Sequence, residues 1–231
     1  MNEQKDLKQT IMAMIVDELK NYDIQGVTSS ETKYHVPVSI SARHLHVSQE
    51  DLERLFGSGH KLTIFKQISQ LGQFAAEEKV TLKTDKGEIK NVRILGPIRA
   101  QTQIELSKSE CRQLGLPGIV RNSGDLKGSP GLIIEGPMGS VYLQEGVIIP
   151  DRHIHMTPAD AVAYGVVHGE KVSLEIDGPK GGRLDEVTIR VSDRYQLDTH
   201  IDTDDANAFL IEQGTWAKIV KKGDAYETGN R

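Results

Sequence analysis

The sequence predicts a mainly β protein built from two related halves. From residue 35 onward, short β-rich segments alternate with glycine-containing turns, and this spacing is typical of barrels or sandwiches. Helical segments are few and brief. The phrase Arg-His-Leu-His-Val-Ser at residues 43–48 returns as Arg-His-Ile-His-Met-Thr at residues 152–157, which indicates an internal repeat. A chain of 231 residues is long enough for two small domains that each bury a core.

Three regions are expected along the chain. Residues 5–21 place apolar side chains at helical spacing opposite a polar face, which predicts an amphipathic helix, and a polar linker without periodicity extends to residue 33. Glycine and proline cluster at residues 124–131, so we expect the two domains at residues 34–127 and 128–231. The N-terminal helix either packs on the first domain or serves as a docking or targeting peptide.

Local patterns predict the individual elements. Strands are expected at residues 36–40, 79–83, 92–95, 102–106, 132–135, 141–143, 147–149, 171–176 and 187–191. Short helices are expected at residues 48–56, 107–114 and 158–164. Two of these helices begin with motifs that resemble capping boxes in which Asp replaces Glu, namely Ser48 with Asp51 and Thr157 with Asp160.

The repeated phrase carries metal-ligand chemistry. Alternate side chains of a strand share a face, so both histidines of a His-x-His motif can reach one cation. His44 and His46 form one such pair, and His153 and His155 form the other. A single pair is weak evidence because paired surface histidines also occur without function. The duplication favours metal sites.

Two further residues are candidate third ligands. His200 precedes another threonine-initiated helix start, the same local design as in the repeat, and is assigned to the His153/His155 pair. Glu105 lies in an alternating stretch just before a helix cap and can complete the first set. Solvated surface roles are the alternative for both. Three ligands with an open position are typical of catalytic zinc, and such sites also accept cobalt, nickel or iron.

Composition excludes several classes of protein. With 28 basic and 33 acidic residues the net charge is −5, which argues against broad binding to nucleic acid. Cys111 is the only cysteine, so an intrachain disulfide and a thiolate metal cage are excluded, and a buried structural thiol is expected. No run approaches the roughly 18 apolar residues that span a bilayer, and the N-terminus lacks a secretory signal. We therefore expect a soluble, cytoplasmic protein with no nucleic-acid or membrane partner.

Arg99 is a candidate anion-binding residue. It follows a strand and a Gly-Pro turn shortly before Glu105, and an arginine near a metal can clamp an oxyanion such as phosphate with its planar fork. The alternative is a surface arginine that pairs with a neighbouring carboxylate.

Five runs of residues carry a resemblance to a known family. They lie in order across both halves, at residues 38–46, 93–99, 121–128, 146–156 and 199–207. Together they closely resemble the PduL-type phosphate propanoyltransferases, the phosphotransacylases of bacterial microcompartments. The resemblance implies two β-barrel domains with a dinuclear zinc centre at their junction, and an exchange of coenzyme A and phosphate on a short acyl group.

The resemblance also implies roles for individual residues. One zinc ion, near the coenzyme A sulfur, would be held by His44, His46 and Glu105, and the second by His153, His155 and His200. Arg99 and Ser123 match positions assigned to phosphate handling and catalysis. The family's coenzyme A surface matches Ser41, Lys66, Arg93, Leu95 and Asn207.

The implied partners are acyl-CoA and phosphate, with propanoyl as the expected acyl group and acetyl as an alternative. The N-terminal helix and linker resemble encapsulation peptides, which predicts a location inside a bacterial microcompartment and contacts with its shell or core proteins. The sequence is compatible with a homo-oligomer. A metal-dependent thioester hydrolase and a noncatalytic, metal-stapled assembly module are the rival functions. Three rather than four protein ligands per metal favours catalysis.

Overall fold

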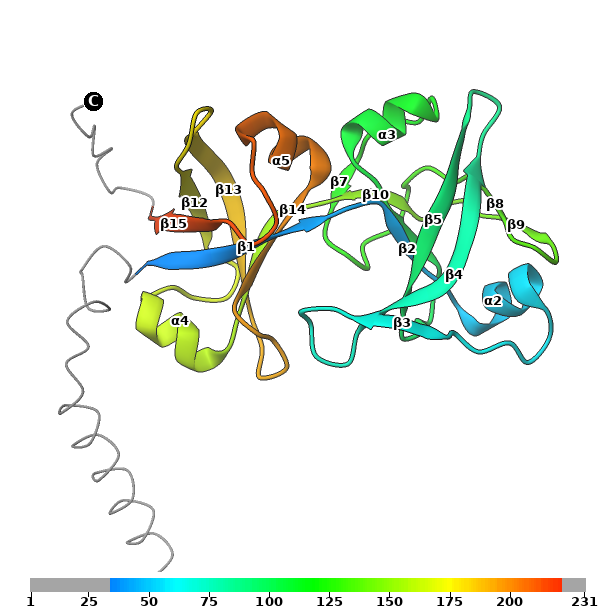
Figure 1. The fold of residues 1–231 in the computed structure, drawn as a ribbon, viewed down its shortest axis with the longest axis horizontal. Helices are drawn as coiled ribbons and strands as arrows, with labels where there is room; N and C mark the ends of the chain where they lie inside the picture. The colour runs from blue at the N-terminus through cyan, green and yellow to red at the C-terminus, as the bar shows by residue number, and fades with distance from the viewer. Residues whose placement is uncertain (1–33, 222–231) are drawn as a thin grey trace, which may run out of the picture. The chain divides into compact units, whose positions relative to one another are not determined.

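The computed structural model describes residues 34–221, and its architecture is mainly β, as predicted (Figure 1). One sheet closes into a six-stranded barrel, and the other is a nine-stranded sheet. The expected N-terminal helix at residues 5–21 and its linker lie outside the described residues. Among residues 34–221, no helix is long and apolar enough to cross a membrane.

The barrel strands follow the order β1–β14–β11–β13–β12–β15. Their bounds are β1 (His35–Ser41), β11 (His153–Met156), β12 (Lys171–Ile176), β13 (Gly182–Val191), β14 (Asp198–Asp202) and β15 (Trp216–Val220). Two helices accompany the barrel, α4 (Pro158–Tyr164) and α5 (Thr203–Phe209).

The nine-stranded sheet follows the order β7–β10–β6–β2–β5–β4–β8–β9, with β3 paired to β4. Its strands are β2 (His44–His46), β3 (Ile64–Gln67), β4 (Phe74–Lys83), β5 (Glu88–Gly96), β6 (Gln103–Glu105), β7 (Val120–Arg121), β8 (Ile133–Glu135), β9 (Ser140–Tyr142) and β10 (Val147–Pro150). The helices α2 (Gln49–Phe56) and α3 (Lys108–Gln113) accompany this sheet.

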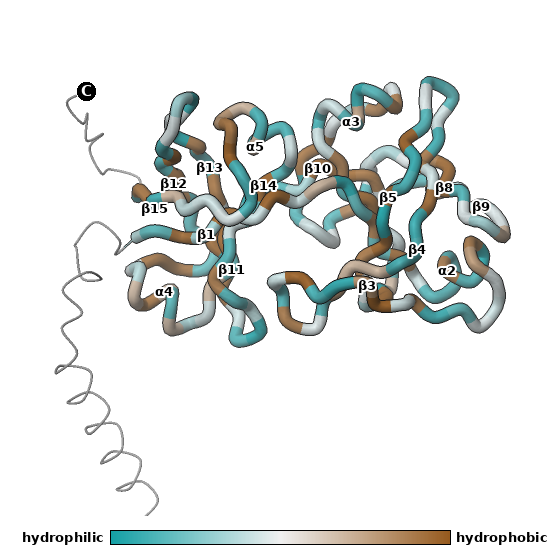
Figure 2. Tube along the Cα trace, in the orientation of Figure 1, coloured by the Kyte–Doolittle hydropathy of each residue, from teal (hydrophilic) through white to brown (hydrophobic). Residues whose placement is uncertain are grey.

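Each sheet has its own hydrophobic core, and apolar positions alternate with polar ones along the strands (Figure 2). Leu45 lies in the core of the nine-stranded sheet and Ile154 in the core of the barrel, and both are fully buried. The residue between the two histidines of each motif therefore anchors its strand, and the histidines face the other way.

The two sheets divide the chain differently from the expected domains at residues 34–127 and 128–231. Strand β1 belongs to the barrel, where it pairs parallel with β14 and antiparallel with β15. Strands β8, β9 and β10 belong to the nine-stranded sheet. All buried core residues of that sheet fall between residues 45 and 149. The first strand thus joins the second half of the chain, and the segment between β1 and β11 forms the other sheet.

The internal repeat of the sequence is also a repeat of strand pairing. Strand β2 pairs parallel with β5 and antiparallel with β6, while β11 pairs parallel with β13 and antiparallel with β14. The registers match as well, because His44 lies opposite Glu105 and His153 opposite His200. In each set, therefore, the third candidate ligand lies on the antiparallel neighbour of the His-x-His strand, directly opposite the first histidine.

Both hydrogen bonds of the predicted cap are present at the start of α4, and one of the two is present at the start of α2. Thr157 and Asp160 form a reciprocal capping box at the start of α4. At the start of α2, Ser48 Oγ accepts a hydrogen bond from the Asp51 amide at 3.1 Å. The Asp51 carboxylate, however, accepts from Thr102 Oγ1 at 2.5 Å, which ties α2 to the start of β6.

Candidate metal centre

A cleft of about 290 Å³ collects the candidate ligands from both sheets. The nine-stranded sheet and its loops contribute the lining residues His44, His46, Ile68, Gln70, Gln73, Leu95, Arg99, Glu105, Ser123 and Pro150. The barrel and the segments next to it contribute Ser41, Asp151, His153, His155, Arg190, Tyr195, His200 and Ile201.

The first candidate set consists of His44, His46 and Glu105. Their ligand atoms all lie within 4.8 Å of one another, and all three residues are buried. His44 Nε2 lies 3.4 Å from Glu105 Oε2, and the two imidazole rings meet edge to face at 5.2 Å between centroids. This donor set of two imidazoles and one carboxylate can hold a divalent transition metal.

The second candidate set consists of His153, His155 and His200, whose ligand atoms also lie within 4.8 Å of one another. The ring centroid of His153 lies 4.7 Å from that of His155 and 5.1 Å from that of His200. Three imidazoles from two adjacent strands therefore converge on one point, which suits the same class of metal.

Backbone carbonyls fix the orientation of three of the histidines. His44 Nδ1 donates to the Ala42 carbonyl at 2.9 Å, and His153 Nδ1 donates to the Asp151 carbonyl at 2.8 Å. In both halves, therefore, the first histidine of the motif donates to the carbonyl of the residue two positions before it. His46 Nδ1 donates to the Leu95 carbonyl at 3.0 Å. An Nδ1–H that donates to a carbonyl leaves the Nε2 lone pair free, and this is the form that ligates a metal.

The electrostatic environment favours the neutral form of His46, His153, His155 and His200. Burial, together with His44 and Arg99, lowers the pKa of His46 to about 2. Burial, His200 and Arg190 lower the pKa of His155 to about 3. Burial also lowers the pKa of His153 and of His200. Neutral imidazoles are the ligating species, so the site is prepared for a cation at neutral pH.

A hydrogen-bonded chain joins the first set to Arg99. Gln103 Nε2 donates to Glu105 Oε1 at 2.5 Å and to Ser123 Oγ at 2.7 Å. Ser123 Oγ in turn donates to Glu105 Oε1 at 3.1 Å. Arg99 Nη1 donates to Ser123 Oγ at 3.1 Å. The guanidinium group thus lies beside the first set and bonds a hydroxyl, rather than forming the surface ion pair considered as the alternative.

Sequence reasoning did not assign Gln70, Gln73, Gln103, Arg190 and Tyr195, all of which line or support the cleft. Arg190 Nη2 donates to Asn122 Oδ1 at 2.8 Å, and burial lowers the pKa of this arginine, as it does for Arg99. The alternation along β6 was a usable signal for Gln103, because it shares a face with Glu105. The loop residue Gln70 offered no such pattern.

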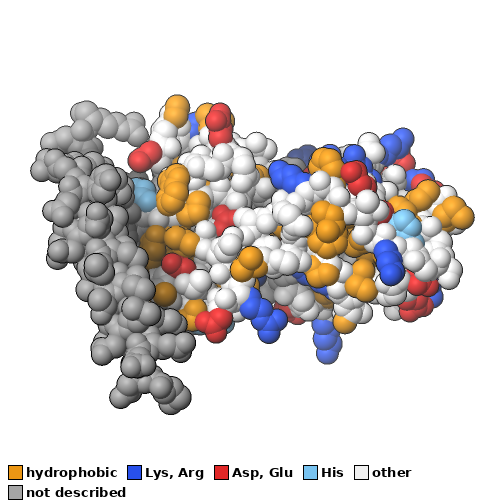
Figure 3. Space-filling model, turned by 60° about the horizontal axis from the view of Figure 1, so that its bottom comes forward, with side chains coloured by type: hydrophobic (Ala, Val, Ile, Leu, Met, Phe, Trp, Pro, Cys, Tyr) orange, Lys and Arg blue, Asp and Glu red, His pale blue; other side chains and the backbone are white. Residues whose placement is uncertain are grey.

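The predicted coenzyme A residues divide into two groups. Ser41 and Leu95 line the cleft. Lys66, Arg93 and Asn207 lie outside it, and the Arg93 guanidinium stacks over the Phe65 ring at 4.3 Å from its centroid. Basic, acidic and hydrophobic side chains are intermingled on the face seen in Figure 3. A coenzyme A prediction therefore depends on these individual residues and not on a broad basic patch of that face.

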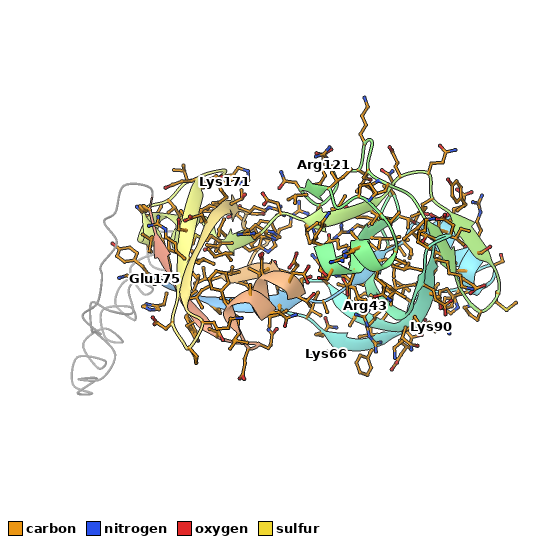
Figure 4. The ribbon with its side chains drawn as sticks, turned by 90° about the horizontal axis from the view of Figure 1, so that it is seen from above. Arg43, Lys66, Lys90, Arg121, Lys171 and Glu175 are labelled. Carbon is orange, nitrogen blue, oxygen red and sulfur yellow. The ribbon has the colours of Figure 1, made fainter. Side chains whose placement is uncertain are left out.

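The repeated arginine that precedes each pair of histidines has a structural role. Arg43, which Figure 4 shows beside α3, pairs with Glu110 at 2.9 Å, and Arg152 pairs with Asp205 at 3.1 Å. Each carboxylate comes from the helix that follows the third candidate ligand, so each arginine ties the His-x-His strand to that helix.

Cys111 is buried, as predicted, and burial raises its pKa to about 11. A thiol with so high a pKa is almost entirely protonated at neutral pH and is a poor nucleophile.

Two comparisons define the class of protein to which this fold and site belong. The sequence model of the phosphate propanoyltransferase family matches residues 37–212. A phosphate propanoyltransferase of Thermotoga maritima is 47% identical over 185 residues, which cover 80% of this chain and 88% of that protein. A phosphate propanoyltransferase of Priestia megaterium is 47% identical over 210 residues, covering 91% and 94%, and one of Salmonella typhimurium is 43% identical over 205 residues, covering 88% and 91%.

The chain is therefore a transferase, and it belongs to the phosphate propanoyltransferase family. The resemblance noted in the sequence is confirmed over both halves of the chain.

Proposed function

We propose that this enzyme interconverts a short-chain acyl-CoA plus phosphate with an acyl phosphate plus coenzyme A, with propanoyl as the main acyl group and acetyl as the alternative. The observation that carries the proposal is the convergence of two metal-ligand sets, Arg99 and Ser123 on one cleft. The names of the relatives support the same reaction.

We propose zinc as the metal of both sets, with His44, His46 and Glu105 holding one ion and His153, His155 and His200 the other. The donor sets fit, because the ligand atoms of each set converge within 4.8 Å of one another, as two imidazoles with a carboxylate in the first set and as three imidazoles in the second. Each set would supply three protein ligands to its ion and would leave a further position for water or substrate, as catalytic sites do. A bound zinc ion acts as a Lewis acid that polarises a carbonyl or stabilises a thiolate.

The side chains of the cleft then position the phosphate. Arg99 and Arg190 both line the cleft, and two guanidinium groups can neutralise a phosphate dianion and fix it with paired hydrogen bonds. In the transfer, a phosphate oxygen attacks the thioester carbonyl carbon, the C–S bond breaks, and coenzyme A leaves as the thiolate. Ser123 accepts a hydrogen bond from Arg99, and once its hydroxyl proton turns away from Glu105 it can donate to the phosphate or to the oxyanion that forms at the carbonyl.

Coenzyme A is proposed to enter along Ser41 and Leu95, with Lys66, Arg93 and Asn207 contacting its more distant groups. The first two line the cleft, whereas Lys66 and Asn207 are exposed. We further propose that residues 1–33 deliver the enzyme to a bacterial microcompartment by binding shell or core proteins.

Phosphate-dependent thiol release tests the reaction. Metal-loaded protein is incubated with propanoyl-CoA with and without inorganic phosphate, free thiol is followed, and acyl phosphate is trapped as its hydroxamate. We expect release that requires phosphate and yields one acyl phosphate per thiol. Release without phosphate would identify the thioester hydrolase, and the absence of release would favour a different acyl substrate or the assembly module.

Arg99→Ala supplies the matched test of phosphate handling. We expect a loss of turnover on the order of 10²-fold with metal content unchanged, because an orienting and charge-stabilising contact is removed. Arg112→Ala, which changes an exposed arginine of α3, is the control and should keep full turnover. Near-normal phosphate kinetics in Arg99→Ala would remove Arg99 from the mechanism.

A further inference from the structure

One of the four repeat histidines lacks the backbone hydrogen bond that the other three make among the described residues. His44, His46 and His153 each donate Nδ1–H to a backbone carbonyl. His155 is 8% exposed, yet its Nδ1 has no hydrogen-bond partner among residues 34–221. A ligand imidazole normally has such a partner, because the bond fixes the tautomer and the plane of the ring.

The repeat shows what is missing at His155. In the first half, Leu45 lies opposite Ile94 of β5, and the carbonyl of the next residue, Leu95, accepts from His46. In the second half, His155 lies opposite Arg190 of β13. The Arg190 carbonyl takes the place of the Leu95 carbonyl in the register, but it does not accept a hydrogen bond from the His155 ring.

An aromatic ring covers His155 instead. The rings of Tyr195 and His155 are stacked, with 3.9 Å between centroids and 16° between planes. The Tyr195 amide donates to the Ser192 carbonyl at 3.1 Å, and the Ser192 amide donates to the Met156 carbonyl at 3.0 Å. The turn that carries the tyrosine is thus bonded to the strand that carries the histidine, which holds the backbones of the two residues next to each other.

We infer that Tyr195 is the positioning residue of His155, and that ring stacking replaces here the carbonyl hydrogen bond that orients the other three histidines. This inference rests on the proposed metal binding of the second set. A stacked ring restricts rotation of the imidazole about its side-chain bonds and so lowers the entropy lost when His155 takes up a metal. The aromatic face carries the effect, and the tyrosine hydroxyl is not required for it.

The consequence is selective for one centre. Removal of the ring in Tyr195→Ala should weaken metal binding by the second set, and losses of an outer partner of a ligand typically cost about 10- to 100-fold in metal affinity. Tyr195→Phe keeps the stacked ring and should bind metal like the parent. The first set, whose histidines have carbonyl partners, should not respond.

The experiment measures metal release from each centre separately. Glu105→Ala disables the first set and leaves a metal in the second, while His153→Ala does the reverse. Each background is combined with Tyr195→Ala and Tyr195→Phe, and release to a chromogenic chelator is followed. Tyr142→Ala, which removes a tyrosine that is 71% exposed on β9, is the control.

We expect Tyr195→Ala to weaken binding at least 10-fold in the Glu105→Ala background only, with Tyr195→Phe close to the parent. In the otherwise unchanged chain, Tyr195→Ala should speed the release of one metal and not of the other. An unchanged release, an equal effect on both centres, or a Phe variant as impaired as the Ala variant would overturn the inference. An unsubstituted protein that binds no metal at all would instead overturn the proposed function on which the inference depends.

Discussion

Gln103 offers a quantitative test of how the first ligand set is supported. The side chain is 2% exposed and makes three hydrogen bonds, two from Nε2 to Glu105 and Ser123, and one to its Oε1 from the Gly124 amide at 2.7 Å. Gln103→Leu keeps the approximate volume of the side chain but removes all three. The bond to the buried Glu105 carboxylate contributes about 1.5–3 kcal/mol, and each of the other two about 0.5–1 kcal/mol because water can reach Ser123 and Gly124.

The expected loss of stability is therefore about 2.5–5 kcal/mol, which lowers the Tm by about 5–20 °C in a protein of this size. Urea and thermal unfolding of chelator-treated protein measure it without the stabilising effect of a bound metal. Turnover should fall as well, because the loop with Ser123 loses two of its bonds to β6 and keeps only the one from Ser123 to Glu105. Gln101→Leu changes an exposed glutamine of the same segment and should stay within about 0.5 kcal/mol. Equal stability of the two variants would refute the support role of Gln103.

Two further predictions concern titration and the lone thiol. The pKa values of His46 and His155 are about 2 and about 3 in the folded protein, below the value of about 6.5 in an unfolded chain. On acidification the unfolded state therefore binds protons before the folded state does. The metal-free protein should lose stability as the pH falls from about 6.5 toward 3. Burial raises the pKa of Asp205 to about 6, so this carboxylate takes up its one proton in the folded state first and offsets part of the loss. Urea midpoints that stay constant or rise on acidification would contradict the reasoning. Cys111→Ala should keep turnover while losing some stability to the cavity it leaves, and abolished turnover with intact metal content would point to a covalent acyl-enzyme.

Local rules were enough to predict the strands that carry the two His-x-His pairs and Glu105, whereas β14, which carries His200, was not among the expected strands. Strand alternation places His44 and His46 on one face, and the cap at Ser107 correctly ends the strand that holds Glu105. These features depend on neighbours within a few residues. The function of these ligands as a metal centre stays a prediction, which the converging geometry supports.

Long-range pairing could not be predicted in the same way. Alternation identified β1 as a strand, but nothing in residues 36–40 specifies that it pairs with β14 rather than with its own half. The loop that brings Gln70 into the cleft is held by Ser69 Oγ, which donates to Asp198 Oδ2 at 2.6 Å across 129 residues of sequence. Such a contact exists only when both sheets are folded, so the sequence carries no local signal of it.

The pairing of β1 with the barrel leads to a final prediction about independent folding. A fragment of residues 43–151 contains all nine strands of the second sheet and its whole buried core. A fragment of residues 34–127 carries β1 without its partners and lacks five buried core residues, namely Leu132, Ile134, Val141, Val147 and Ile149. At about 1.5–3 kcal/mol for each buried side chain, this loss is about 7.5–15 kcal/mol, which is comparable to the whole stability of an ordinary domain, about 5–15 kcal/mol.

We therefore expect residues 43–151 to unfold cooperatively in urea and residues 34–127 to show no folding transition. The larger fragment also keeps His44, His46 and Glu105, so it should bind one metal where the whole chain binds two. Cooperative unfolding of residues 34–127 would favour the division expected from the glycine cluster. Failure of residues 43–151 to fold would mean that the nine-stranded sheet needs the barrel, because contacts such as Ser69 with Asp198 join the two into one cooperative unit.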